Sequence, residues 1–124
     1  MNNITIAILN EAEAKLEAYC KEHGMMGKVQ VQMENEYLAL KKAYNIRCAE
    51  VANKIHNKGV IVWSKSDEFM SYAAANIAQR AIIAEIVEVF NAYENNDLKE
   101  FQKAIAKVKT NRNINCEALL QLLS

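Results

Sequence analysis

The amino-acid sequence predicts an all-α fold, and three observations carry that prediction. The chain of 124 residues has no proline and only three glycines, so little interrupts a helical backbone. Apolar residues make up 52% of the chain, which is enough for a packed core. Most of them recur at three- and four-residue steps, the period of a helix with one buried face. At this length we expect one helical domain over residues 1–124.

The first helix is predicted from Asn3 to His23. Asn3 has a side chain that caps helix starts, and Gly24 suits the left-handed residue that follows a helix end. Residues 29–33 then alternate between apolar and polar side chains. This alternation predicts either a short strand or the first turns of the next helix.

The second helix has the clearest periodicity in the chain. Its apolar stripe consists of Met33, Tyr37, Leu40, Tyr44, Cys48, Val51 and Ile55. The charged residues of the same stretch, including Arg47, are assigned mainly to the other, solvated faces. Gly59 closes this helix, and residues 60–63 form a short strand or an extended connector, because they are β-branched and aromatic.

The third helix is predicted to begin after a cap at Ser64 or Ser66 and to run to about Tyr93. Apolar side chains occupy nearly all of its faces, so we expect it to be buried on most sides. The second and third helices would form a long antiparallel hairpin, and shorter helices would flank it. Those flanking helices are expected at residues 98–109 and 116–123, with a cap at Asp97.

The predicted hairpin also indicates a homo-oligomeric helical bundle. Each long helix would measure roughly 40 Å, which exceeds the compact diameter of a chain of this size. The shorter helices would then leave an apolar face of the third helix open, and large exposed apolar faces are typical of interfaces. We therefore expect a homo-oligomer, a dimer or a higher assembly.

Charge and cysteine usage narrow the class of protein. The formal net charge is zero, so the sequence lacks the basic excess that nucleic-acid binders carry, and we expect no nucleic-acid partner. Three widely spaced cysteines do not form a disulfide framework. Because neither a signal peptide nor a membrane-spanning segment is recognisable, we expect a cytoplasmic protein.

No catalytic signature stands out, so we expect a protein that is not an enzyme and needs no cofactor or metal. The alternative enzyme is an all-α, Mg²⁺-dependent nucleotide pyrophosphohydrolase, for which Glu85 and Glu88 would supply one carboxylate pair. Glu34 and Glu36 are the nearest candidates for the second pair, but two residues apart they do not share a helix face. A helical protein–protein adaptor is the other alternative.

Polar residues gather at the predicted helix junctions. They comprise Lys28 at the first joint, Asn91 and Asn95 at the end of the third helix, and Lys109 and Arg112 at the end of the fourth. Trp63 is in the connector, where we expect its large ring either to stack on a base or to cover the core. Cations, amides and a ring are what a pocket for an anionic nucleotide requires.

Taken whole, the chain resembles the Tad family of phage Thoeris anti-defence "sponge" proteins. The likeness rests on chain size, the opening helix from Met1-Asn2-Asn3-Ile4-Thr5-Ile6, the Gly27-Lys28-Val29 joint, the long hairpin and the last third, which is rich in Lys, Arg and Asn. The resemblance implies a homo-oligomer that sequesters cyclic ADP-ribose isomers made by TIR-domain enzymes and does not cleave them.

The resemblance also implies roles for particular residues at a site between subunits. Lys28, Lys109 and Arg112 would face the pyrophosphate. Asn91 and Asn95 would hydrogen-bond the ribose or the base. The ring of Phe90 or Trp63 would stack on the adenine.

Overall fold

A computed structural model describes residues 4–24, 27–62, 72–73 and 75–124, and these residues form five helices in chain order. They are α1 (Ile6–His23), α2 (Lys28–Ile55), α3 (Ile77–Glu94), α4 (Leu98–Thr110) and α5 (Cys116–Leu123). The all-α prediction is therefore confirmed over the described part of the chain. Contacts divide the molecule into two compact units, Met1–Ile46 and Arg47–Ser124, with the border inside α2.

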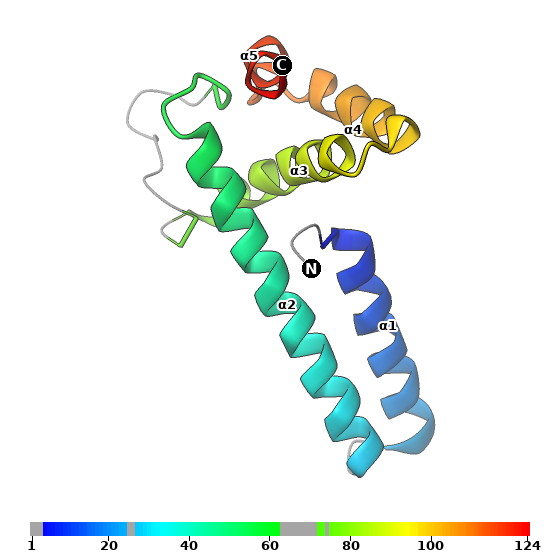
Figure 1. Cartoon of the computed structure of the whole chain (residues 1–124). Helices are drawn as coiled ribbons and strands as arrows, with labels where there is room; N and C mark the ends of the chain where they lie inside the picture. The colour runs from blue at the N-terminus through cyan, green and yellow to red at the C-terminus, as the bar shows by residue number, and fades with distance from the viewer. Residues whose placement is uncertain (1–3, 25–26, 63–71, 74) are drawn as a thin grey trace. The chain divides into compact units, whose positions relative to one another are not determined.

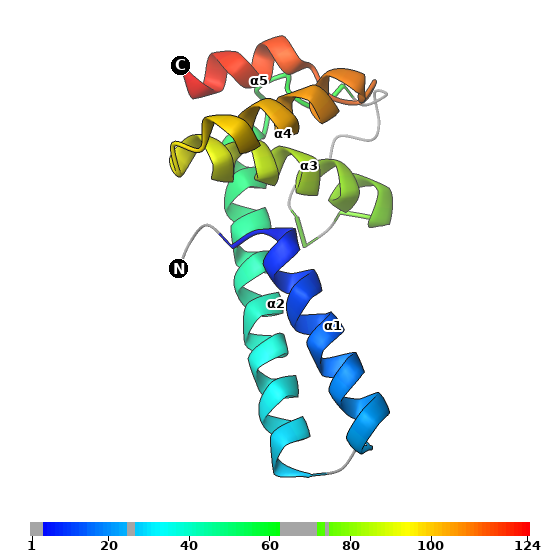
Figure 2. The ribbon, with the colours of Figure 1, turned by 90° about the vertical axis from the view of Figure 1, so that its right-hand side faces the viewer.

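The first unit is an antiparallel pair made of α1 and the first part of α2 (Figures 1 and 2). Thr5 caps α1, because its hydroxyl accepts a hydrogen bond from the backbone N–H of Ile8. The predicted cap at Asn3 lies outside the described residues. Gly24 ends the helix at φ 85°, as predicted. The Tyr37 hydroxyl bridges the two helices by donating to a Glu13 carboxylate oxygen at 3.3 Å.

The strand considered for residues 29–33 is wrong, and the alternative, the start of the next helix, is confirmed. The α2 helix begins at Lys28, directly after Gly27 at φ 143°. Gln30 Nε2 donates to Glu34 Oε2 at 2.7 Å, a contact that four-residue helical spacing allows. Val29 and Val31 are about half exposed, so their alternation with polar residues does not reflect a buried strand face.

The second unit contains the end of α2 and the helices α3, α4 and α5. The α3 and α4 helices run antiparallel, side by side, and a short turn at residues 95–97 joins them (Figures 1 and 2). Their apolar faces and the end of α2 make the core. The fully buried aliphatic side chains of this core are Val51, Val60, Ile83, Ile86, Val87, Val89, Val108 and Leu119.

The third predicted helix begins later than expected. Tyr72 and Ala73 lie in a turn, and Asn76 caps α3 in a reciprocal capping box with Gln79. The predicted caps at Ser64 and Ser66 lie outside the described residues. The second arm of the predicted hairpin is therefore the 18-residue α3, and the long hairpin as a whole stays a prediction.

The connector at 60–62 is extended, and its partner lies in the same chain. Ile61 forms an isolated antiparallel bridge with Ile114. Val62 N donates to the Asn113 carbonyl at 2.8 Å, and Asn115 N donates to the Val60 carbonyl at 2.7 Å. The end of α2 is thereby tied to the turn between α4 and α5, an arrangement that hydrophobic periodicity does not reveal.

The apolar face on which we based the oligomer is largely buried. The side chains of Ile82, Ile86 and Val89 are at most 5% exposed, and the large exposed apolar side chains of α3, Ile77 and Tyr93, lie at its two ends. This premise of the oligomer prediction was wrong, because α4 and the end of α2 cover α3. The oligomer itself stays a prediction.

Candidate functional site

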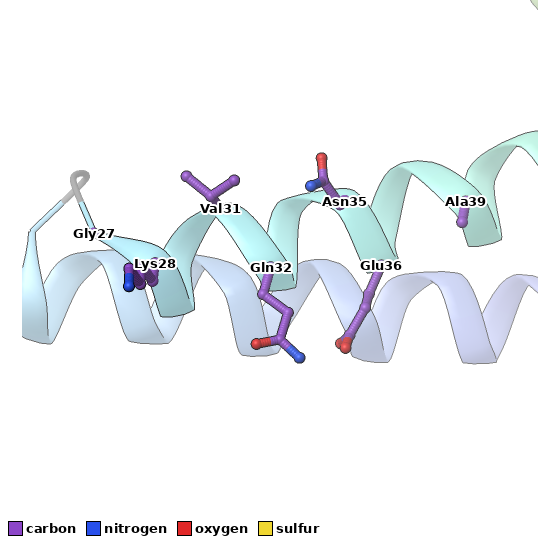
Figure 3. A pocket seen from close by; sticks show the side chains of 7 residues that line it. All are labelled: Gly27, Lys28, Val31, Gln32, Asn35, Glu36 and Ala39. Atoms are coloured by element: carbon purple, nitrogen blue, oxygen red, sulfur yellow. The ribbon is translucent and has the colours of Figure 1, made fainter.

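Lys28 lies in the first unit, where it opens α2 and is exposed to solvent. It lines a shallow depression of about 790 Å³ on one side of α2, together with Gln32, Asn35 and Glu36. In Figure 3, Gln32 and Glu36 extend to one side of this depression and Asn35 to the other. Val31 and Ala39 add apolar walls, and one helix alone does not close this surface into a pocket.

Phe90 and Asn91 are placed in the interior of the second unit. Asn91 is 1% exposed, and its Oδ1 accepts a hydrogen bond from Arg47 Nε at 2.8 Å. Lys54 Nζ lies 5.4 Å from the centre of the Phe90 ring. In this chain both residues therefore serve the packing of α2 against α3.

Arg47 is the centre of this packing and was missed from the sequence. It is 3% exposed, although we had assigned it to a solvated face. Its guanidinium binds the Glu94 carboxylate and lies 3.3 Å from Glu50 Oε2. An arginine keeps its charge when buried, so it needs these partners. The signal was its spacing, because Arg47 lies three residues after Tyr44 and four before Val51, both of which belong to the apolar stripe.

Asn95 forms the C-cap of α3. Its backbone N–H donates to the Asn91 carbonyl at 2.9 Å, and the next residue, Asn96, adopts the left-handed φ of 55° that turns the chain into α4. The Asn95 side chain is exposed at this turn.

Lys109 and Arg112 lie at the other end of the α3–α4 pair. Both are exposed, and neither forms an ion pair with another residue of the described chain. The turn that carries Arg112 is well held, because Asn111 Nδ2 donates to Glu85 Oε2 at 2.7 Å and Asn111 Oδ1 accepts the N–H of Asn113 at 2.9 Å. The extended segment that ends at Val62 lies directly against this turn.

The predicted ligand residues therefore do not form one cluster within a single chain. The Asn111–Glu85 contact sets the end of α4 beside a position ten residues before Asn95, which corresponds to about 15 Å along α3. Lys28 belongs to the other unit, and Trp63 lies outside the described residues. What the structure brings together is Lys109, Arg112 and the connector that leads to position 63.

Cys48 and His23 also carry chemically reactive groups, and each contacts a tyrosine of the described chain. Cys48 is fully buried and forms a hydrogen bond with Tyr72. The pKa of Tyr72 is raised, first by the burial of its own hydroxyl and then by the charge of the Cys48 thiolate. His23 is exposed and stacks on Tyr19, with 4.5 Å between ring centres. Within the described residues, no three His, Cys, Asp or Glu side chains gather in a way that would hold a metal ion.

Three comparisons and a search for membrane spans add context. No protein-family model, no curated protein and no solved structure matches this chain. None of the helices in the described part is long and apolar enough to cross a membrane.

Proposed function

We propose that this chain binds a small anionic nucleotide of the cyclic ADP-ribose type and retains it without cleavage, thereby removing a signal of TIR-based anti-phage defence from the host cytoplasm. The observation that carries the proposal is the pair of exposed cations, Lys109 and Arg112, on a turn held by its own hydrogen bonds. Cations that no carboxylate among the described residues engages are available to a pyrophosphate.

The held turn favours binding because little ordering remains to be done when a ligand arrives. Arg112 would contact two phosphate oxygens at once, and Lys109 would add a point charge. Asn95 would join the same ligand only from another copy of the chain, since within one chain it lies about 15 Å away along α3. The proposed site therefore lies between subunits of a homo-oligomer.

A protein–protein adaptor is the second candidate function, and a different observation favours it. Ile77 is 89% exposed and Leu98 is 69% exposed, although both are large apolar side chains. Leu98 also lines a hollow with Tyr93 and Phe101, and an exposed apolar patch of this kind suits docking on another protein. The adaptor would not need Arg112, which separates it from the nucleotide-binding proposal.

The decisive experiment is a thermal-shift assay of the full chain with a panel of nucleotides that includes cyclic ADP-ribose isomers and linear nucleoside triphosphates with Mg²⁺. A ligand that binds only the folded chain raises the melting temperature by mass action. Recovery of intact cyclic nucleotide after heat denaturation would support sequestration. Breakdown of a triphosphate would support the Mg²⁺-dependent hydrolase, and absence of any shift would favour the adaptor.

Arg112→Ala tests the residue that carries the proposal. Loss of a charge-assisted contact costs about 1.5–3 kcal/mol, so the Kd for the cyclic nucleotide should rise by roughly tenfold or more. Lys99→Ala, which removes an exposed lysine at the other end of α4, is the matched control and should bind as the wild type does. Equal affinity of the two variants would remove Arg112 from the site.

A further inference from the structure

Glu85 brings a carboxylate to the turn that carries Arg112. Its Oε2 atom accepts a hydrogen bond from Asn111 Nδ2 at 2.7 Å, and both side chains are half-buried. No cation among the described residues forms an ion pair with this carboxylate. The Asn111 amide is neutral, so the hydrogen bond holds Glu85 in place and leaves its negative charge uncompensated.

The geometry of the chain sets this charge close to the two cations of the proposed site. Asn111 directly precedes Arg112 and follows Lys109 by two residues. Asn111 Oδ1 also accepts the N–H of Asn113 at 2.9 Å, so the amide is fixed between the carboxylate and the turn. Because successive Cα atoms are about 3.8 Å apart, a phosphate held by Arg112 would lie on the order of 7 Å from Glu85, within the Debye length at physiological salt.

A fixed carboxylate at this distance affects how much charge a ligand can carry. Lys109 and Arg112 contribute one positive charge each and Glu85 one negative charge, so the three side chains sum to +1. At about 7 Å in water, repulsion by Glu85 lowers the affinity roughly threefold for each negative charge on the ligand. A terminal phosphate carries up to about two negative charges, and a phosphate that bridges two groups carries about one fewer.

We propose that Glu85 is a specificity-determining residue of the nucleotide site, whose charge favours a nucleotide with only bridging phosphates over one that ends in a free phosphate. This inference rests on the proposed function, because it concerns the ligand that Lys109 and Arg112 would hold. Asn111 is the positioning residue that keeps the carboxylate beside the turn. A sponge has use for such selection, since nucleoside triphosphates are abundant in cells and would otherwise fill the site.

Glu85→Gln tests the proposal, because the glutamine oxygen can still accept the Asn111 hydrogen bond while the charge is removed. Isothermal titration calorimetry at low ionic strength, with a chelator to remove Mg²⁺, measures the Kd of each protein for cyclic ADP-ribose and for ATP. We expect the variant to bind both ligands more tightly and the preference for cyclic ADP-ribose over ATP to fall roughly tenfold. Added salt should reduce this difference between the proteins.

Glu100→Gln is the matched control, because it removes the same charge near the other end of α4, roughly 15 Å from Lys109. It should change the preference by about twofold or less. Circular dichroism of each variant checks that its helices are intact. A Glu85→Gln preference equal to that of the wild type, or an equal change in Glu100→Gln, would overturn the inference and leave the proposed function standing. A wild type that binds no cyclic ADP-ribose isomer would overturn both.

Discussion

The cationic side chain of Arg47 is almost completely buried. Its guanidinium is engaged by Asn91, Glu94 and Glu50, which come from both sides of the contact between α2 and α3. Lys54 adds a longer contact, 3.9 Å, to the other oxygen of Glu94. The two cations differ in burial, since the Arg47 side chain is 3% exposed and that of Lys54 is 49% exposed.

That difference predicts unequal effects of substitution. Arg47→Ala removes the guanidinium that the buried Asn91 oxygen and the Glu94 carboxylate bind and should lower the free energy of unfolding by about 3 kcal/mol. Lys54→Ala removes an exposed cation and should cost about 0–1 kcal/mol. Urea denaturation at neutral pH measures both, and losses of equal size would contradict the structural role given to Arg47.

Tyr72 should make stability depend on alkaline pH. Burial, then the Cys48 thiolate charge and the hydrogen bond to Cys48, raise the pKa of Tyr72, and Arg80 lowers it by less. A pKa raised in the folded state means that its contribution to stability is complete below the ordinary tyrosine pKa of about 10 and is lost as the pH rises through the higher folded value.

Tyr72→Phe should therefore flatten the decline of the urea midpoint above about pH 10, and ultraviolet absorbance should lose one late-titrating tyrosinate component. Because Tyr37 also has a raised pKa, from burial and from Glu13, Tyr37→Phe is measured in parallel. An alkaline slope that is the same with and without the Tyr72 hydroxyl would refute this assignment.

The ends of the helices show which parts of the fold neighbouring residues in the sequence were enough to predict. The last helix was predicted at Cys116–Leu123 and is found there, and Asp97 caps α4 as its spacing from Glu100 indicated. Each of these ends depends on side chains within four residues. The start of α3 was missed, because the serines at 64 and 66 have a capping preference similar to that of Asn76, and local preference alone does not rank the three positions.

The cap of α3 gives a prediction at the scale of one element. Asn76→Ala removes the oxygen that accepts the Gln79 N–H and should destabilise the chain by about 1 kcal/mol. Asn76→Asp keeps an equivalent acceptor and should remain near the wild type. Thermal unfolding followed by circular dichroism compares the three proteins, and an Asp variant as weak as the Ala variant would argue against capping as the cause.

The candidate site could be predicted less well than the helices. Lys109 and Arg112 were found because a polar loop after an amphipathic helix is visible in the sequence. That the 60–62 connector lies against this loop, and that Asn91 faces Arg47, depend on contacts between residues more than forty positions apart. Periodicity shows which face of a helix is apolar, and it does not show which element covers that face.

The two units of the molecule differ in how completely their side chains are buried, and this should be visible in hydrogen exchange. In the second unit, α3 presents fully buried Ile83, Ile86 and Val87, so opening it exposes much of the core. In the first unit, α1 has Leu9 as its one buried residue. Amides open at a free energy that follows the apolar contacts that must be broken.

We therefore expect α1 amides to exchange at least about tenfold faster than those of residues 82–92 in dilute protein. Hydrogen–deuterium exchange with peptide-level mass spectrometry measures both rates. Protection of α1 equal to that of α3 would show that the sparser burial of α1 does not weaken the first unit.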